Sequence, residues 1–258
     1  MTYFQAIILG IVQGVTEFLP ISSSAHLVLV PYLLKWEIPL SQVFPFDVLV
    51  QIGTLLAVII YFRKDLWEII VAVLTGLRDR HPFPAPHARL GWYLVLASVP
   101  AGIAGLLLKE VIERAFSDPL VSARFLFLTA ALLVMAELIG HRNRVLADVT
   151  WKDSLIIGFF QVLSLFPGVS RSGSTITGGM SRHLDRSTSG RFAFLMSVPI
   201  MLAAGVASLP DLFETPNLSS FLPVVGVGFI ISALVGYFSI HWLLSFLNRR
   251  RLYGFAIY

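Results

Sequence analysis

The sequence predicts an all-α polytopic membrane protein, built as an inverted-topology repeat with two re-entrant helix pairs and five to six transmembrane helices. Three observations predict this fold. The 258 residues are 56% hydrophobic and 13% charged, with a mean hydropathy of +0.80, whereas a soluble domain carries about 25% charged residues. A phrase of apolar, proline and serine residues occurs twice. Basic residues are concentrated in alternate loops.

The apolar stretches define the predicted spans. Five of them have the roughly 20 residues that a helix needs to cross a bilayer. They cover 45–62, 90–108, 120–140, 191–209 and 221–247. A sixth segment, 66–77, is too short to span, so we expect it to lie along the membrane interface or to extend the preceding helix.

The repeated phrase covers residues 10–26 and 158–174. Each copy interrupts an apolar segment, 2–34 or 152–184, with proline and a cluster of serines, so each segment should break into two half-helices. Polar, broken backbone inside a membrane is costly and usually marks a binding site. At one constant offset the copies align Gly10 with Gly158, Gln13 with Gln161, Phe18 with Phe166, Ser22 with Ser170, and Ser24 with Ser172.

Charge sets the predicted orientation. Most of the 19 Lys and Arg residues fall in the loops after the first, third and fifth spans and before the fourth. By the positive-inside rule these loops are cytoplasmic. Three spans separate the two copies, so the second copy should be inverted relative to the first, and both serine loops should meet near the midplane.

The chain then forms one integral membrane domain with two halves. The first repeat, 1–148, has three spans after its broken segment, and the second, 149–258, has two. A last span is missing from the second half, so either the chain was shortened or this half ends early.

Composition excludes other functional classes. Cysteine is absent, which excludes disulfides and thiolate chemistry. The excess of 19 basic over 15 acidic residues is modest. It lacks the alternation of basic and aromatic residues expected of a nucleic-acid surface, so we expect no nucleic-acid partner and assign the excess to membrane topology.

The first copy carries candidate acid–base groups. Gln13 and Glu17 are four residues apart and share one helix face. A carboxylate and an amide on one face suit a hard divalent cation or a general base. The alternative is a helix-terminal glutamate that reaches the interface, although an ionisable group inside a membrane is by default a functional candidate.

Ser22, Ser23, Ser24 and His26 follow the first break. A serine near a histidine can act as an activated nucleophile. The alternative is helix capping by serine beside a solvated histidine, because serine is a preferred N-cap residue.

The second copy carries a candidate anion site. The fork of Arg171 fits phosphate oxygens, and hydroxyl donors surround it at Ser170, Ser172 and Thr175. The half-helix that should begin here presents free N–H groups to an anion. The alternative is an arginine that snorkels to the interface. Together the copies predict an acid–base half facing an anion-binding half, whose ligand is a phosphate or diphosphate on a lipid head group.

Two motifs carry a family resemblance. Residues 13–17 read Q-G-V-T-E and are followed by F-L-P-I-S-S-S-A-H at 18–26, while residues 167–175 read P-G-V-S-R-S-G-S-T. They are similar to the E/Q-x-x-x-E motif with its serine–histidine segment, and to the P-G-x-S-R-S-x-x-T motif, of bacterial undecaprenyl-diphosphate phosphatases of the bacitracin-resistance type. The resemblance covers essentially the whole chain, including 255–258.

The resemblance implies a reaction and a location. A C55 isoprenoid diphosphate would lose its terminal phosphate and give the monophosphate carrier lipid that peptidoglycan synthesis uses again. This recycling would support cell-wall biogenesis, cell shape and bacitracin resistance. The enzyme would cross the bacterial inner membrane several times, with its site open to the periplasmic face. The partners would be the prenyl diphosphate lipid and the bilayer, and a homodimer is left open.

The resemblance also implies residue roles. Glu17 and Gln13 would bind a divalent cation, Mg²⁺ or Ca²⁺, or position water. Ser23 would be the nucleophile and His26 its acid–base partner, with metal-activated water as the alternative attacking group. The diphosphate would be held by Arg171, Ser170, Ser172 and Thr175, with Ser22 and Ser24 in the same substrate-binding set.

The chain departs from the family at two positions, and two other functions would use the same features. Ala25 stands where the family usually has glycine, and the chain stops where the family has a last transmembrane helix. A transporter or flippase of an anionic prenyl phosphate lipid would also use an inverted repeat, and a lipid-phosphate receptor would also bind anions. The carboxylate, serine and histidine favour hydrolysis. A second class of lipid phosphatase is rejected, because Thr177 stands where its histidine would fall.

Overall fold

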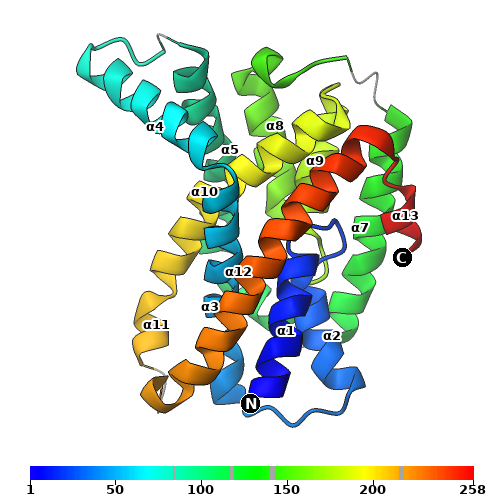
Figure 1. The fold of residues 1–258 in the computed structure, drawn as a ribbon. Helices are drawn as coiled ribbons and strands as arrows, with labels where there is room; N and C mark the ends of the chain where they lie inside the picture. The colour runs from blue at the N-terminus through cyan, green and yellow to red at the C-terminus, as the bar shows by residue number, and fades with distance from the viewer. Residues whose placement is uncertain (84, 117–118, 140–142, 215–217) are drawn as a thin grey trace.

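The computed structural model of the chain describes residues 1–83, 85–116, 119–139, 143–214 and 218–258. Within these ranges the regular structure is helical, apart from one isolated β-bridge between Arg144 and Leu184. Figure 1 shows the helices gathered into one bundle, with the chain beginning at one end of the long helices.

In the described part of the chain, five helices are long and apolar enough to cross a membrane, which confirms the five predicted spans. Three follow the first broken segment and two follow the second. This arrangement confirms an all-α polytopic membrane fold. The five are α3 (Leu40–Tyr61), α5 (Pro86–Leu107), α7 (Pro119–Ile139), α10 (Arg186–Ala207) and α12 (Leu218–Arg249).

The short apolar segment forms its own helix, α4 (Arg63–Arg78). It begins directly after α3 and leans away from the bundle (Figure 1). The apolar side chains of Trp67 and Leu74 are exposed on it, as expected of a helix at a membrane interface. The remaining short elements are α6 (Lys109–Phe116), the 3-10 turn η1 (Leu146–Asp148), α11 (Leu209–Phe213) and α13 (Tyr253–Ile257).

Each copy of the repeated phrase forms two helices with a break between them, as predicted. The first pair is α1 (Tyr3–Thr16) and α2 (Ser23–Leu33), and the second is α8 (Trp151–Leu163) and α9 (Arg171–Ser181). Figure 1 shows α1 and α8 running toward the middle of the molecule from opposite ends, so that the two loops lie side by side. The backbone N–H of Gly168 donates to the Ser24 hydroxyl across them, at 3.4 Å. The symmetry of the repeat and its division after residue 148 stay predictions.

The helix starts follow local capping chemistry. Thr2 and Thr150 begin α1 and α8, each accepting a hydrogen bond from the backbone of a residue in the first turn and completing a capping box. Ser22 and Ser170 cap α2 and α9, each accepting a hydrogen bond from a backbone N–H of the first turn, without a capping box. The capping interpretation of the serine clusters therefore holds for these two serines, and it leaves their neighbours available for other contacts.

Phe18 anchors the end of α1 in the protein interior. Its ring is 1% exposed and packs edge-to-face on Phe194 of α10, with centroids 5.4 Å apart. Because lipid is as apolar as the core, close packing of this kind holds membrane helices together better than burial alone. The contact fixes the residue directly after Glu17 and so fixes where that carboxylate can point.

A buried carboxylate ties together the outer ends of the second helix pair. Asp153 is fully buried, and its two oxygens accept hydrogen bonds from Arg182 at 2.9 Å and Arg144 at 2.6 Å. Burial alone would raise the pKa of Asp153, but the hydrogen bonds from Arg144, Arg182 and Thr150 outweigh it and hold the pKa well below the ordinary value. These ion pairs join the start of α8 to the residue just after α9, and so fix the two helices relative to each other.

Candidate active site

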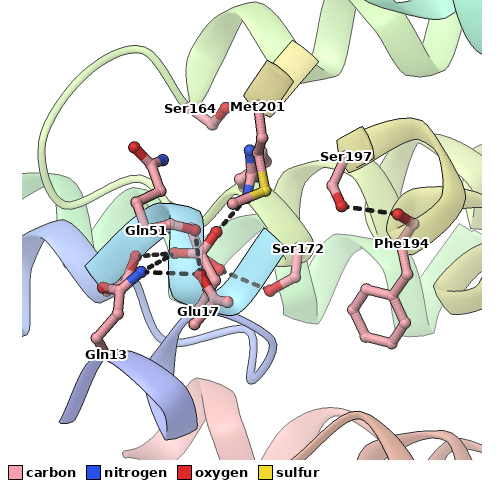
Figure 2. A network of polar contacts seen from close by, with 12 residues as sticks. Gln13, Glu17, Gln51, Ser164, Ser172, Phe194, Ser197 and Met201 are labelled. Carbon is pink, nitrogen blue, oxygen red and sulfur yellow. Dashed lines mark hydrogen bonds and ion pairs between the residues drawn. The ribbon is translucent and has the colours of Figure 1, made fainter. Parts of the chain in front are cut away.

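Glu17, the first residue after α1, is the centre of the polar network between the two loops. It is 7% exposed, and its Oε2 accepts hydrogen bonds from Gln13 Nε2 at 3.0 Å and from the Ser23 hydroxyl at 2.7 Å. Its Oε1 is ion-paired with the guanidinium of Arg171. Figure 2 shows Gln13 reaching toward Glu17, with dashed lines converging on the carboxylate. The structure thus brings one carboxylate against a hydroxyl and a guanidinium.

Arg171 supplies the positive charge from the other helix pair. It is the first residue of α9, and its Nη2 lies 2.9 Å from the Met201 sulfur as well as against Glu17. Its side chain is 19% exposed. A buried carboxylate is costly unless it is paired, and here the pairing joins the two broken segments. This ion pair between the two helix pairs argues against the alternative of an arginine that snorkels to the interface.

A cavity of about 190 Å³ opens beside this ion pair. This volume suits a phosphate-containing head group better than a long chain. Apolar side chains of α5 and α10 close one side, and Figure 2 shows Gln51 and Ser164 near the Glu17 network. Its polar lining is Glu17, Ser22, Ser23, Ser24, Gln51, Gln161, Ser164, Ser170 and Arg171.

The serines of the first loop have different partners. Ser22 caps α2 from a left-handed backbone conformation, with φ at 70°, which is rare for a residue other than glycine. Its hydroxyl lies 3.2 Å from that of Ser24. Of the three serines in this loop, Ser23 is the one that donates to Glu17. The first loop therefore places Ser23 against the Glu17 carboxylate. Ser22 caps α2, and Ser24 contacts the second loop.

The second loop, which joins α8 to α9, is fixed by Thr129, a residue that no sequence pattern singled out. Thr129, on α7, accepts from the backbone N–H of Ser170 at 2.9 Å and donates to the Gly168 carbonyl at 3.0 Å. Gly168 has φ at +98°, and a Cβ there would lie 2.1 Å from the Ser122 carbonyl oxygen. Only glycine fits this turn. The loop is therefore held rigidly with Ser170 and Arg171 directed at the cavity.

Two predicted phosphate ligands line a separate, much smaller pocket that also contacts Glu17 and Arg171. The Ser172 hydroxyl is 3.1 Å from that of Ser170, and the Thr175 hydroxyl donates to the Arg171 carbonyl at 2.7 Å. Neither residue lines the main cavity. Their contacts support the first turn of α9, and their direct role as ligands stays a prediction.

The structure gives His26 other hydrogen-bond partners than Ser23. Its Nδ1 is 2.6 Å from the Ser22 carbonyl oxygen and its Nε2 is 3.0 Å from the Tyr258 hydroxyl, with the two rings stacked. It lines a largely apolar groove between α1, α2 and the C-terminal segment, not the cavity that contains Glu17. Its role as acid–base partner of Ser23 stays a prediction.

The predicted divalent cation can be tested against the donor set. The Oε1 of Gln13 is buried and has no hydrogen-bond partner among the described residues, so it offers an oxygen beside the Glu17 carboxylate. No cluster of three or more His, Asp or Glu side chains suited to a metal occurs in the described part of the chain. Mg²⁺ is commonly bound by one or two carboxylates together with substrate phosphates and water. The residues therefore fit a cation that binds with its phosphate substrate.

Several lining residues carried little or no signal in the sequence. Gln51 and Thr129 lie inside apolar spans, where only their polarity could have marked them. Gln161 is on α8, and Ser164 follows directly after it. Of these two, Gln161 did carry a signal, because it aligns with Gln13 in the repeated phrase.

Comparison with known proteins connects this geometry to a family. The family model for the bacitracin resistance protein BacA matches residues 6–258. An undecaprenyl-diphosphatase of Gemmatimonas aurantiaca is 45% identical over 258 residues, covering 100% of this chain and 94% of the relative. Relatives of the same name from Myxococcus xanthus and Corynebacterium striatum are 42% and 41% identical, covering all of this chain and 86% and 91% of their own lengths. The chain belongs to the bacitracin resistance protein BacA family.

Proposed function

We propose that this protein is an undecaprenyl-diphosphate phosphatase, which releases inorganic phosphate from the C55 isoprenoid diphosphate and recycles the monophosphate carrier lipid for peptidoglycan synthesis. The observation that carries this proposal is the double contact of the Glu17 carboxylate, with the Ser23 hydroxyl on one side and the Arg171 guanidinium on the other. The names of the relatives support the choice of substrate.

The diphosphate head group would enter a cavity whose wall already carries positive charge. The Arg171 guanidinium can form a bidentate contact with phosphate oxygens, and the N-terminus of α9 adds a positive dipole end beside Ser170. Binding of the diphosphate would draw Arg171 from Glu17, which leaves the carboxylate free to accept a proton. Substrate binding and activation of the base are then one event.

The transfer itself needs a nucleophile and a base in contact. Ser23 Oγ attacks the terminal phosphorus as its proton passes to Glu17, and the bond to the bridging oxygen breaks, so that the lipid monophosphate leaves. Water then attacks the phosphorus of the phosphoserine, and the bond between phosphorus and Ser23 Oγ breaks. Glu17 returns its proton to Ser23 Oγ, and inorganic phosphate leaves with the oxygen of the water, whose excess proton passes to solvent. The 2.7 Å contact between Ser23 and Glu17 supports serine over direct attack by water. It also supports Glu17 over His26 as the proton acceptor.

A divalent cation completes the proposed site. Glu17 and the Oε1 of Gln13 would hold Mg²⁺ or Ca²⁺ together with oxygens of the diphosphate. When bound, the cation would neutralise charge on the transferring phosphoryl group. The proposed setting is the bacterial inner membrane, with the cavity open to the periplasmic face, supported by the predicted cytoplasmic side of the basic loops. The homodimer stays a prediction.

The rival is a flippase for an anionic prenyl phosphate lipid, favoured by the meeting of two broken segments in the middle of the bundle (Figure 1). The deciding assay measures phosphate released from a prenyl diphosphate by the purified protein in detergent, with and without a chelator. Release that the chelator abolishes and Mg²⁺ or Ca²⁺ restores supports the phosphatase. Absence of release with any divalent ion, together with lipid movement between leaflets of proteoliposomes, would favour the flippase.

A further inference from the structure

The cavity contains a polar side chain that the proposed reaction does not use. Gln161, on α8, is 1% exposed and lines the cavity together with Arg171 and Ser170. Neither its Oε1 nor its Nε2 has a hydrogen-bond partner among the described residues. Buried amides are nearly always hydrogen-bonded, so one left with both atoms unpartnered indicates a ligand that the side chain is built to contact.

The other glutamine of the repeated phrase is in a different state. Gln13 Nε2 donates to Glu17 and lies 3.4 Å from the Thr54 hydroxyl. Its amide donor is therefore committed within the protein. Gln161, which aligns with it, lines the same cavity as Arg171, and its amide donor has no partner among the described residues. The repeat thus supplies one amide that holds the base and a second that is uncommitted at the cavity.

Close packing explains why Gln161 is held at the cavity wall. Three residues before it, Gly158 lies so near α5 that a Cβ there would be 2.4 Å from the Ala97 carbonyl oxygen. Residues three apart share a helix face, so Gln161 is directed to the same side of α8. Ala101, one turn beyond Ala97 on α5, lines the same cavity as Gln161.

We propose that the Gln161 side chain is a substrate ligand, and that its Nε2 donates a hydrogen bond to a non-bridging oxygen of the diphosphate. This inference rests on the proposed function. An amide donor next to an arginine suits an anion because the guanidinium supplies the charge and the amide fixes the orientation. A carboxylate of the same shape would repel the same ligand.

The experiment compares Gln161→Leu, Gln161→Met and Gln161→Glu with the wild-type protein. Loss of one hydrogen bond to a charged group should raise KM for a prenyl diphosphate about tenfold or more in the Leu and Met variants, and Gln161→Glu should lose more. The Leu and Met variants should unfold at the wild-type temperature or higher, because an unpaired buried amide has been removed. Ser189→Ala is the matched control, since its buried hydroxyl also has no partner in the described chain but lies outside the cavity.

A second readout separates this inference from the reaction itself. A non-hydrolysable prenyl methylenediphosphonate should raise the unfolding temperature of the wild-type protein and of Ser189→Ala, and should raise it less in Gln161→Leu and Gln161→Met. That difference supports the ligand role even if the wild-type protein releases no phosphate, a result that would reject the proposed function alone. Equal stabilisation by the diphosphonate, or an unchanged KM in both variants, overturns the role of Gln161.

Discussion

The Arg171 guanidinium at the start of α9 is ion-paired with the Glu17 carboxylate just after α1. The two charges come from different copies of the repeated phrase and meet where the two broken segments lie side by side (Figure 1). Each is therefore compensated in the buried site before any ligand binds. An anionic head group competes directly with Glu17 for Arg171, and this competition links recognition of phosphate to release of the base.

Ser23 is expected to carry the phosphoryl group. Ser23→Ala should lower phosphate release about 100-fold or more, because nucleophile and base act in contact. Acid quenching of the wild-type protein during turnover, followed by mass spectrometry, should find a phosphorylated Ser23. The control is Ser239→Ala on α12, whose hydroxyl only bonds the carbonyl of Val235 in its own helix. Full activity of Ser23→Ala without any adduct would instead favour attack by water.

Gly168 is expected to be indispensable to the second loop. Gly168→Ala places a Cβ against the Ser122 carbonyl in a backbone conformation with φ at +98°, so it should destabilise the protein by about 2 kcal/mol or more. It should also reduce activity by displacing Ser170 and Arg171. Gly226→Ala on α12 is the control, because nothing lies within 4 Å of the added Cβ. Unfolding temperatures in detergent give the comparison, and an equal effect of both changes would contradict the role of the turn.

Asp153 is expected to stabilise the fold in a pH-dependent way. Asp153→Asn removes the charge that Arg144 and Arg182 share, and should cost about 2 kcal/mol at pH 7. The folded-state pKa of Asp153 is lowered. Its stabilisation is therefore complete above the ordinary carboxyl pKa of about 4 and is lost as the pH falls below it. The difference in unfolding temperature between wild type and variant should narrow from pH 5 to pH 3; a constant difference would argue against the ionised pair.

Much of the architecture could be predicted because membranes impose strong rules on sequence. Apolar length located the five spans, and proline with serine located both breaks, since spans and interruptions are local features. Helix starts at Ser23 and Arg171 followed from capping chemistry. The interpretation of Glu17 and Arg171 as intramembrane functional groups also agreed with their meeting in space.

The remaining site residues depended on tertiary packing. Thr129 and Gln51 reach the loops only because α7 and α3 pack beside them, and no local pattern reports such an approach. The contact of His26 with the Tyr258 hydroxyl is of the same kind, because it joins the first loop to the other end of the chain.

The most direct test of the Glu17–Arg171 site measures phosphate release from a prenyl diphosphate by Glu17→Gln, Arg171→Gln and the double variant in detergent. Each single change should lower the rate about 100-fold or more, because one removes the base and the other the charge that stabilises the transferring phosphoryl group. The double variant should lose little beyond the worse single variant, since the two residues act as one unit. Near wild-type release from either single variant would contradict the site.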